Sequence, residues 1–150
     1  GQVLLNGSEL PKKGYNPVQL IYQHPEKSIN PRLKMRSVLE EAGPIDYNLI
    51  EAIGIEEDWL NRYPRELSGG ELQRFSVARA LNEKTEFIIA DEISTMLDVI
   101  TQVQIWKVII DFVNKRNIGL MAVTHNKHLA EKICNRIFYL ERENEKNDGE

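Results

Sequence analysis

The sequence predicts an α/β protein built on a parallel sheet. In its second half, short apolar runs alternate with longer amphipathic segments, the order strand, helix, strand, helix, strand. Phe87–Ala90 is apolar throughout and includes β-branched residues, which is typical of a strand buried on both faces of a parallel sheet. Polar residues follow these runs directly, and parallel sheets place their ligands at the carboxyl ends of strands.

Two more strands are expected near the start of the chain. Gln2–Leu5 is a short strand candidate that ends at the turn dipeptide Asn6-Gly7, and residues 9–16 are expected to form a loop. Val18–Tyr22 is an apolar-rich strand candidate. It ends before Pro25, because the residue preceding a proline is disfavoured in a helix.

Residues 26–66 are expected to form a small all-helical insert, which continues into a longer helix ending near residue 82. This region contains no β-branched run of strand length, and prolines punctuate it. Helical spacing of apolar residues marks three segments, Met35–Ala42, Tyr47–Ile55 and Glu57–Tyr63. The longer helix presents one apolar face, made of Leu72, Phe75, Ala78 and Leu81.

The last third of the chain is expected to continue the α/β pattern. Val99–Lys115 is an amphipathic helix candidate with an apolar stripe of Val99, Val103, Trp106, Ile110 and Val113. Three more elements follow: a buried strand at Ile118–Thr124, a short helix at Lys127–Cys134 with Leu129, Ala130 and Ile133 facing inward, and a last strand at Arg136–Leu140. Residues 141–150 are charged and expected to fray.

Composition limits the classes of function. The chain has 150 residues, the length of one ordinary domain. Its net charge is −4, so the composition gives no support for nucleic-acid binding. Its single cysteine, Cys134, excludes an internal disulfide and a cysteine-cluster metal site. No apolar run approaches the roughly 18 residues of a membrane span, and the start of the chain does not resemble a signal peptide.

The stretch Ser68-Gly69-Gly70-Glu71 combines two features at a helix start. Ser-x-x-Glu is a capping box, and the two glycines allow a ligand to approach the backbone closely. A helix N-terminus has free N–H groups and partial positive charge, which suit a phosphate. These residues alone favour an ordinary capped surface helix over a binding site.

Polar residues at strand ends are the other candidates. Asp91 could anchor Mg²⁺ through water and Glu92 could polarise an attacking water, although alone they fit an acidic pair in a loop better. His125 closes the strand Ile118–Thr124, where a structural or solvent-facing role is the commoner one. Gln23 follows an earlier strand and fits a simple polar strand terminus, and Asp98 is a plausible helix N-cap.

The octapeptide Leu67–Arg74 resembles the signature motif of ATP-binding cassette (ABC) ATPases, and three further motifs follow the family's order. The resemblance implies a P-loop NTPase-type parallel core with an all-helical signature subdomain. It implies that Ser68, Gly69 and Gly70 hold the γ-phosphate of an ATP bound mainly to another subunit, and that Glu71 and Asp98 belong to the same cofactor-binding site. It further implies these roles: Asp91 and Gln23 hold Mg²⁺, Gln23 as the Q-loop glutamine also reaches the attacking water, and Glu92 is the catalytic glutamate. His125 is implied to be the switch histidine, which contacts the γ-phosphate and the attacking water, and Asp98 to lie in the D-loop. Ile93 and Met96 depart from the family's D-loop pattern.

One family motif is absent. A Gly-x-x-x-x-Gly-Lys-Ser/Thr loop, which cradles the nucleotide phosphates, occurs nowhere in the sequence. The resemblance therefore implies an N-terminally truncated cassette with little ATPase activity of its own. It divides the chain into residues 1–25 of the core, a helical subdomain at 26–82, and the rest of the core at 83–150. Because a strand inside the sheet would be missing, we expect this chain to self-associate.

The resemblance implies an ATP-hydrolysing subunit of an importer for peptides or nickel. The subfamily is suggested by two stretches, residues 28–32 and 61–64. The expected partners are a second ATPase subunit and membrane permeases, at the cytoplasmic face of the membrane, and no nucleic acid. One alternative is a non-catalytic partner that supplies in trans the surface of the signature motif and that of the Q-loop, the segment at Gln23. Another is a DNA-repair type of ABC ATPase, which would need a coiled-coil or zinc insertion between Gln23 and Ser68, and neither is present.

Overall fold

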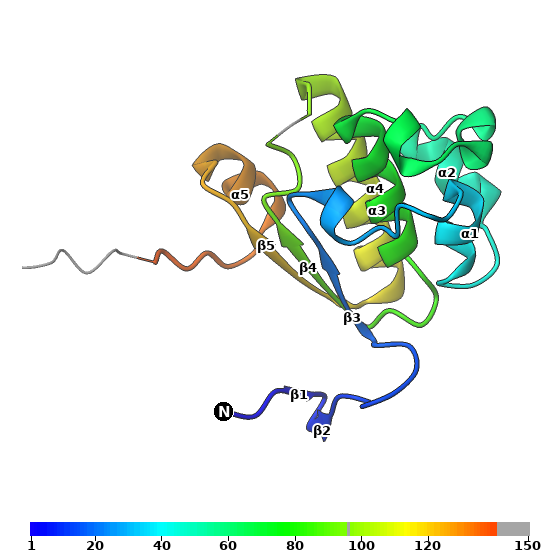
Figure 1. The fold of residues 1–150 in the computed structure, drawn as a ribbon. Coiled ribbons are helices and arrows are strands. Elements are labelled where there is room, and N and C mark those ends of the chain that lie inside the picture. The colour runs from blue at the N-terminus through cyan, green and yellow to red at the C-terminus, as the bar shows by residue number, and fades with distance from the viewer. Residues whose placement is uncertain (96, 141–150) are drawn as a thin grey trace, which may run out of the picture.

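The computed structural model describes residues 1–95 and 97–140 and contains a three-stranded parallel sheet in the order β3-β4-β5 (Figure 1). The strands are β3 (Val18–Ile21), β4 (Phe87–Asp91) and β5 (Gly119–Val123). Each lies within one or two residues of its predicted bounds, and the α/β class is confirmed. Two predictions lie outside the described residues. They are the departure from the D-loop pattern at Met96 and the frayed end at residues 141–150.

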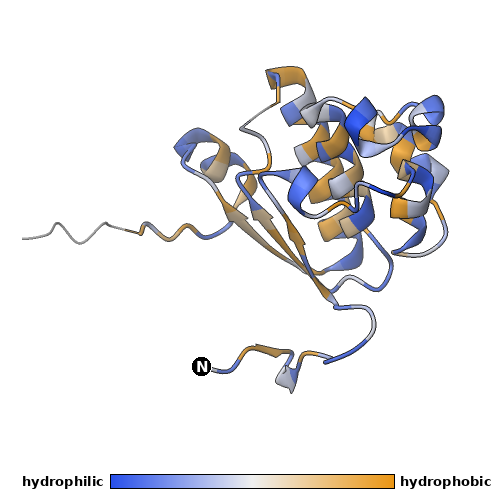
Figure 2. Ribbon diagram, viewed as in Figure 1, coloured by the Kyte–Doolittle hydropathy of each residue, from blue (hydrophilic) through white to orange (hydrophobic). Residues whose placement is uncertain are grey.

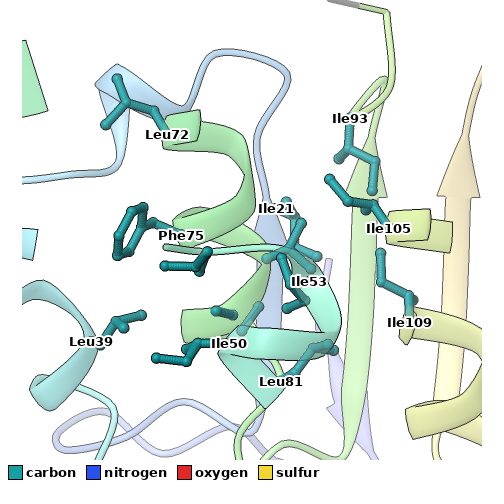
Figure 3. Packing of buried hydrophobic residues seen from close by; sticks show 14 of the residues in the cluster. Ile21, Leu39, Ile50, Ile53, Leu72, Phe75, Leu81, Ile93, Ile105 and Ile109 are labelled. Carbon is teal, nitrogen blue, oxygen red and sulfur yellow. The ribbon is translucent and has the colours of Figure 1, made fainter. Parts of the chain in front are cut away.

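Helices cover one face of this sheet. α3 (Gly69–Ala80) packs on β3, and Figure 3 shows Ile105 and Ile109 of α4 (Val99–Arg116) beside β4. The sheet contributes Ile21 and Ile88, both fully buried, to this core. The predicted apolar face of α3 is confirmed, since Leu72, Phe75, Ala78 and Leu81 are all buried.

The opposite face of the sheet is open within the described residues. Its side chains include Leu20, Met121 and Val123, which are 39, 50 and 44 % exposed. These residues occupy adjacent strands in register, Leu20 beside Ile89 and Ile89 beside Met121. Figure 2 colours the three strands mostly as hydrophobic, with α3 and α4 on one side of them.

The prediction of a strand at Arg136–Leu140 is wrong. Residues 137–140 have no regular secondary structure, and Phe138, Tyr139 and Leu140 are 74, 65 and 96 % exposed. A strand needs a neighbour to pair its backbone groups, and among the described residues β5 pairs only with β4. The apolar composition of this segment therefore did not suffice to make it a strand.

A group of short helices lies beside α3 and α4. It consists of α1 (Met35–Glu40), α2 (Tyr47–Ile53) and 3-10 turns at Pro25–Lys27, Glu57–Asn61 and Pro64–Glu66. Asp46 caps α2 by accepting from the amides of Asn48 and Leu49. The helical character of this region is confirmed, although the third predicted helix is a 3-10 helix.

The chain begins with a small hairpin rather than a single strand. β1 (Leu4–Leu5) pairs with β2 (Ser8–Glu9) around Asn6 and Gly7, which both have positive φ. The turn was predicted. The second strand was not, because Ser8–Glu9 is too short and polar to show a strand pattern.

α4 presents only part of its predicted stripe to the core, since Trp106 is buried and Val113 packs against the core. Its buried residues are Thr101, Ile105, Trp106 and Ile109, whereas Val99 and Val103 are 74 and 63 % exposed. Apolar residues occur around most of this helix, so helical spacing alone allows several buried faces. Packing against the sheet decides which face is buried. α5 (Lys127–Ile133) completes the described fold, with Leu129 and Ile133 partly buried against the core. None of the described helices is both long and apolar enough to cross a membrane.

Candidate functional site

Four of the predicted site residues lie at the carboxyl ends of the three parallel strands. Gln23 follows β3, Asp91 ends β4 with Glu92 directly after it, and His125 follows β5. The strands are parallel and in register, with Asp91 opposite Val123. Their carboxyl ends therefore meet at one edge of the sheet, the edge where open α/β sheets bind ligands.

Glu92 is held in position by its backbone and by His125. It adopts a left-handed conformation with φ of 49°, and its amide donates to the carbonyl of Val123 at 3.0 Å. Its Oε1 accepts from the backbone amide of His125 at 2.9 Å and lies 2.8 Å from Nδ1 of the same residue. A non-glycine residue at positive φ is strained and persists only when its surroundings hold it there.

Gln23 connects to this pair through a residue that the sequence reasoning missed. Its Nε2 donates to Oγ1 of Thr95 at 3.3 Å, and this hydroxyl donates to the carbonyl of Glu92 at 3.0 Å. The sequence pattern gives Thr95 no role of its own. Its place three residues after the catalytic candidate was the one available signal.

Asp91 offers one half-buried carboxylate at the same edge. The described residues contain no cluster of three or more histidine, cysteine or acidic groups able to hold a metal ion. Magnesium in nucleotide sites takes one or two carboxylates, with waters and substrate phosphates as the remaining ligands. The Asp91 carboxylate fits Mg²⁺ on those terms, and Gln23, which follows the neighbouring strand β3, offers an amide oxygen at the same edge.

The amino end of α3 forms the predicted capping box. Oγ of Ser68 accepts from the amide of Glu71 at 3.3 Å, and the Glu71 carboxylate accepts from the amide of Ser68 at 2.6 Å. A Cβ on Gly69 would meet nothing within 4 Å, so the first turn is open to solvent. The unpaired N–H groups of such a helix end fit a phosphate group.

Asp98 caps α4, as its position in the sequence indicated. Its Oδ1 accepts from the amide of Thr101 at 3.0 Å. The Thr101 hydroxyl, and then the Thr101 amide, stabilise the ionised carboxylate and lower the pKa of Asp98.

The structure therefore brings the candidates together in two groups. Gln23, Glu92 and His125 are linked by hydrogen bonds at the sheet edge. The Ser68–Glu71 group makes no hydrogen bond to them within residues 1–95 and 97–140. It lies instead next to the segment before Asp98, since a Cβ on Gly70 would be 3.4 Å from Leu97.

The profile of the ABC transporter family matches residues 1–95, more than half of this chain. The chain thus belongs to the ABC transporter family. Among curated relatives, it is 33 % identical to the dipeptide transport ATP-binding protein DppF of Lactococcus lactis, over 89 % of this chain and 46 % of that protein. It is 30 % identical to the oligopeptide transport ATP-binding protein OppF of Bacillus subtilis, over 91 % of this chain and 52 % of that protein.

The chain spans about half the length of these relatives. Among solved structures, it resembles the ATP-binding cassette MJ0796, a dimer in a post-hydrolysis state bound to ADP and Pi. The TM-score is 0.65 at 24 % identity, covering 75 % of this chain and 54 % of that one. This likeness shows a common fold.

Proposed function

We propose that this chain is part of the ATP-hydrolysing subunit of an ABC importer that takes up peptides. The observation that carries the proposal is the hydrogen-bonded set of Gln23, Glu92 and His125 at the carboxyl edge of the sheet. The family membership supports it. The relatives named for dipeptide and oligopeptide transport favour peptides over nickel as the solute.

The residues at the strand ends have complementary roles in this proposal. Glu92 accepts a proton from an attacking water, because a carboxylate held at the site by two hydrogen bonds is a positioned base. His125 orients that carboxylate. Bound Mg²⁺-ATP would supply the phosphoanhydride bond and a cation that neutralises charge on the phosphates, with Asp91 and Gln23 as the residues that hold the ion.

The residues at the helix starts serve a second subunit. The open first turn of α3, with Ser68, Gly69, Gly70 and Glu71, binds the phosphate of the partner's nucleotide, and Asp98 lies at the same interface. The apolar side chains of Val99 and Ile100 support a contact there, since they are 74 and 81 % exposed directly after Asp98. In this arrangement residues 26–82 form the helical subdomain, and the permease subunits hold the assembly at the cytoplasmic face of the membrane.

A mixing experiment tests the proposal. In the full-length protein, Ser68→Arg blocks the phosphate seat and Glu92→Gln removes the base, so each variant alone is expected to lose ATP hydrolysis. In a mixed dimer, one site combines the intact Glu92 of the first variant with the intact Ser68 of the second. Mixing the two inactive proteins is therefore expected to restore part of the wild-type rate.

The outcome separates the possible arrangements. Recovery on mixing, measured as phosphate release, supports a shared site between two subunits. No recovery, with dimers demonstrated by light scattering, would contradict the assignment of Ser68 and Glu92 to opposite halves of one site. A wild-type protein that hydrolyses no ATP would contradict the proposed function as a whole.

A further inference from the structure

Arg74 lies at the junction of three helices, belongs to one of them and donates hydrogen bonds to the other two. It belongs to α3, and its guanidinium donates to the carbonyl of Ile53 at the end of α2. It also donates to Oε1 of Gln104 at 3.2 Å and to Oγ1 of Thr101 at 3.0 Å, both on α4. No role was assigned to Arg74 from the sequence, where it is simply the last residue of the octapeptide.

The surroundings of Arg74 are built around its side chain. Gly54, which ends α2 with φ of 81°, leaves space for it, because a Cβ there would lie 2.5 Å from Nη1 of Arg74. Gln104 completes the junction by donating to the carbonyl of Ala52 at 3.0 Å. The carboxyl end of α2 is thus tied to α4 through Arg74 and Gln104.

The junction extends to the helix start that carries Asp98. The hydroxyl that accepts from Arg74 belongs to Thr101, whose amide donates to Oδ1 of Asp98 at 3.0 Å. A threonine hydroxyl both accepts and donates, so Thr101 can bond to the guanidinium and the carboxylate together. A shift of α3 relative to α4 would therefore change the position of Thr101 and, with it, of Asp98.

We infer that Arg74 is a positioning residue. Its hydrogen bond to Thr101 holds the first turn of α4, and thereby Asp98, in position. The inference rests on the proposed function for its effect on ATP hydrolysis, since Asp98 belongs to the proposed subunit interface. Its structural part, the dependence of the first turn of α4 on Arg74, stands independently of any activity.

The test uses the full-length protein and two measurements. Arg74→Met keeps the aliphatic stem and removes the guanidinium, while Thr101→Val keeps the shape and removes the hydroxyl. Thr101→Ser restores the hydroxyl. Arg79→Met is the matched control, because Arg79 lies on the same helix but pairs with Glu41 at 3.6 Å, outside the junction.

Hydrogen exchange of residues 98–102 is the first measurement. Arg74→Met and Thr101→Val are each expected to accelerate exchange there by about fivefold, the loss of roughly one net hydrogen bond. The double variant is expected to match Arg74→Met alone, because both changes break one chain of bonds. Unchanged exchange in Arg74→Met, or the same acceleration in Arg79→Met, would overturn the inference.

The kinetics of ATP hydrolysis are the second measurement. Arg74→Met and Thr101→Val are expected to lower kcat roughly two- to tenfold with KM for ATP unchanged, and Thr101→Ser to recover the rate. A rise in KM alone, or failure of Thr101→Ser to recover kcat, would overturn the inference. If the wild type hydrolyses no ATP, the proposed function fails, and the exchange measurement still decides the role of Arg74.

Discussion

Glu92 accepts two hydrogen bonds from His125, one from the backbone amide at 2.9 Å and one from ring Nδ1 at 2.8 Å. The carboxylate is mostly covered, with a side-chain exposure of 20 %, whereas the imidazole is 78 % exposed. The pair therefore presents a largely covered base and an accessible ring, joined by the hydrogen bond at Nδ1. This asymmetry suits a histidine that orients the base and reaches a bound ligand.

Replacing His125 should impair turnover without unfolding the protein. His125→Ala keeps the amide bond to Glu92 but removes the ring, so kcat in the full-length protein should fall on the order of 10²-fold, the lower range for a group acting with a general base. Steady-state phosphate release measures it. His128→Ala is the control, because His128 is an exposed residue of α5. Equal losses in both variants would show that the effect is not specific to the site.

The cap of α4 should be sensitive to acid. The folded-state pKa of Asp98 lies below its ordinary value of 3.8, so the ionised carboxylate contributes stability that is fully present above that value. The contribution is lost as the pH falls through the lowered pKa. An NMR titration of the full-length protein should therefore show Asp98 titrating below 3.8 in the wild type and closer to that value in Thr101→Val. A midpoint above 3.8 in the wild type would contradict the cap geometry.

Thr85 should be needed for the contact between the loop before β3 and the end of α3. It is fully buried, donates to the carbonyl of Ala80 at 2.8 Å and lies 2.8 Å from the hydroxyl of Tyr15. Thr85→Val leaves two polar groups unpaired and should lower the free energy of unfolding by about 1–3 kcal/mol. Denaturant unfolding measures this, with Thr85→Ser as the variant that keeps both bonds. A loss in Thr85→Ser as large as that in Thr85→Val would assign the effect to packing.

The 150-residue chain by itself should self-associate through the open face of the sheet. Leu20, Met121 and Val123 expose apolar area there, and burying a side chain of this kind contributes about 1.5–3 kcal/mol. Light scattering should show particles larger than a monomer, and Met121→Lys should shift the distribution toward monomer. A monodisperse wild-type monomer with a cooperative melt above the mesophile range of roughly 45–65 °C would contradict this expectation.

The sequence was sufficient for local features whose causes are local. The capping box at Ser68 and the turn at Asn6-Gly7 each depend on a few neighbouring residues. It was not sufficient where distant partners decide. The buried face of α4 depends on how the helix meets the sheet, and residues 136–140 depend on a pairing partner that the described residues do not provide.

The same distinction applies to the candidate site. Residues that directly follow strands could be proposed from the pattern, because a parallel sheet gathers its carboxyl ends. Thr95 and Arg74 could not, since each acts by joining segments far apart in the chain. Gln23 and Thr95 are separated by 72 positions and meet only because β3 and β4 are neighbours.

The central claim is that Glu92 is the base for ATP hydrolysis, and parallel binding and turnover measurements on Glu92→Gln test it most directly. The amide keeps the shape of the side chain but cannot take a proton from water. With the full-length protein, calorimetry should give an affinity for Mg-ATP close to that of the wild type, while phosphate release falls by about 10²–10⁴-fold. Hydrolysis by Glu92→Gln at the wild-type rate would contradict the account.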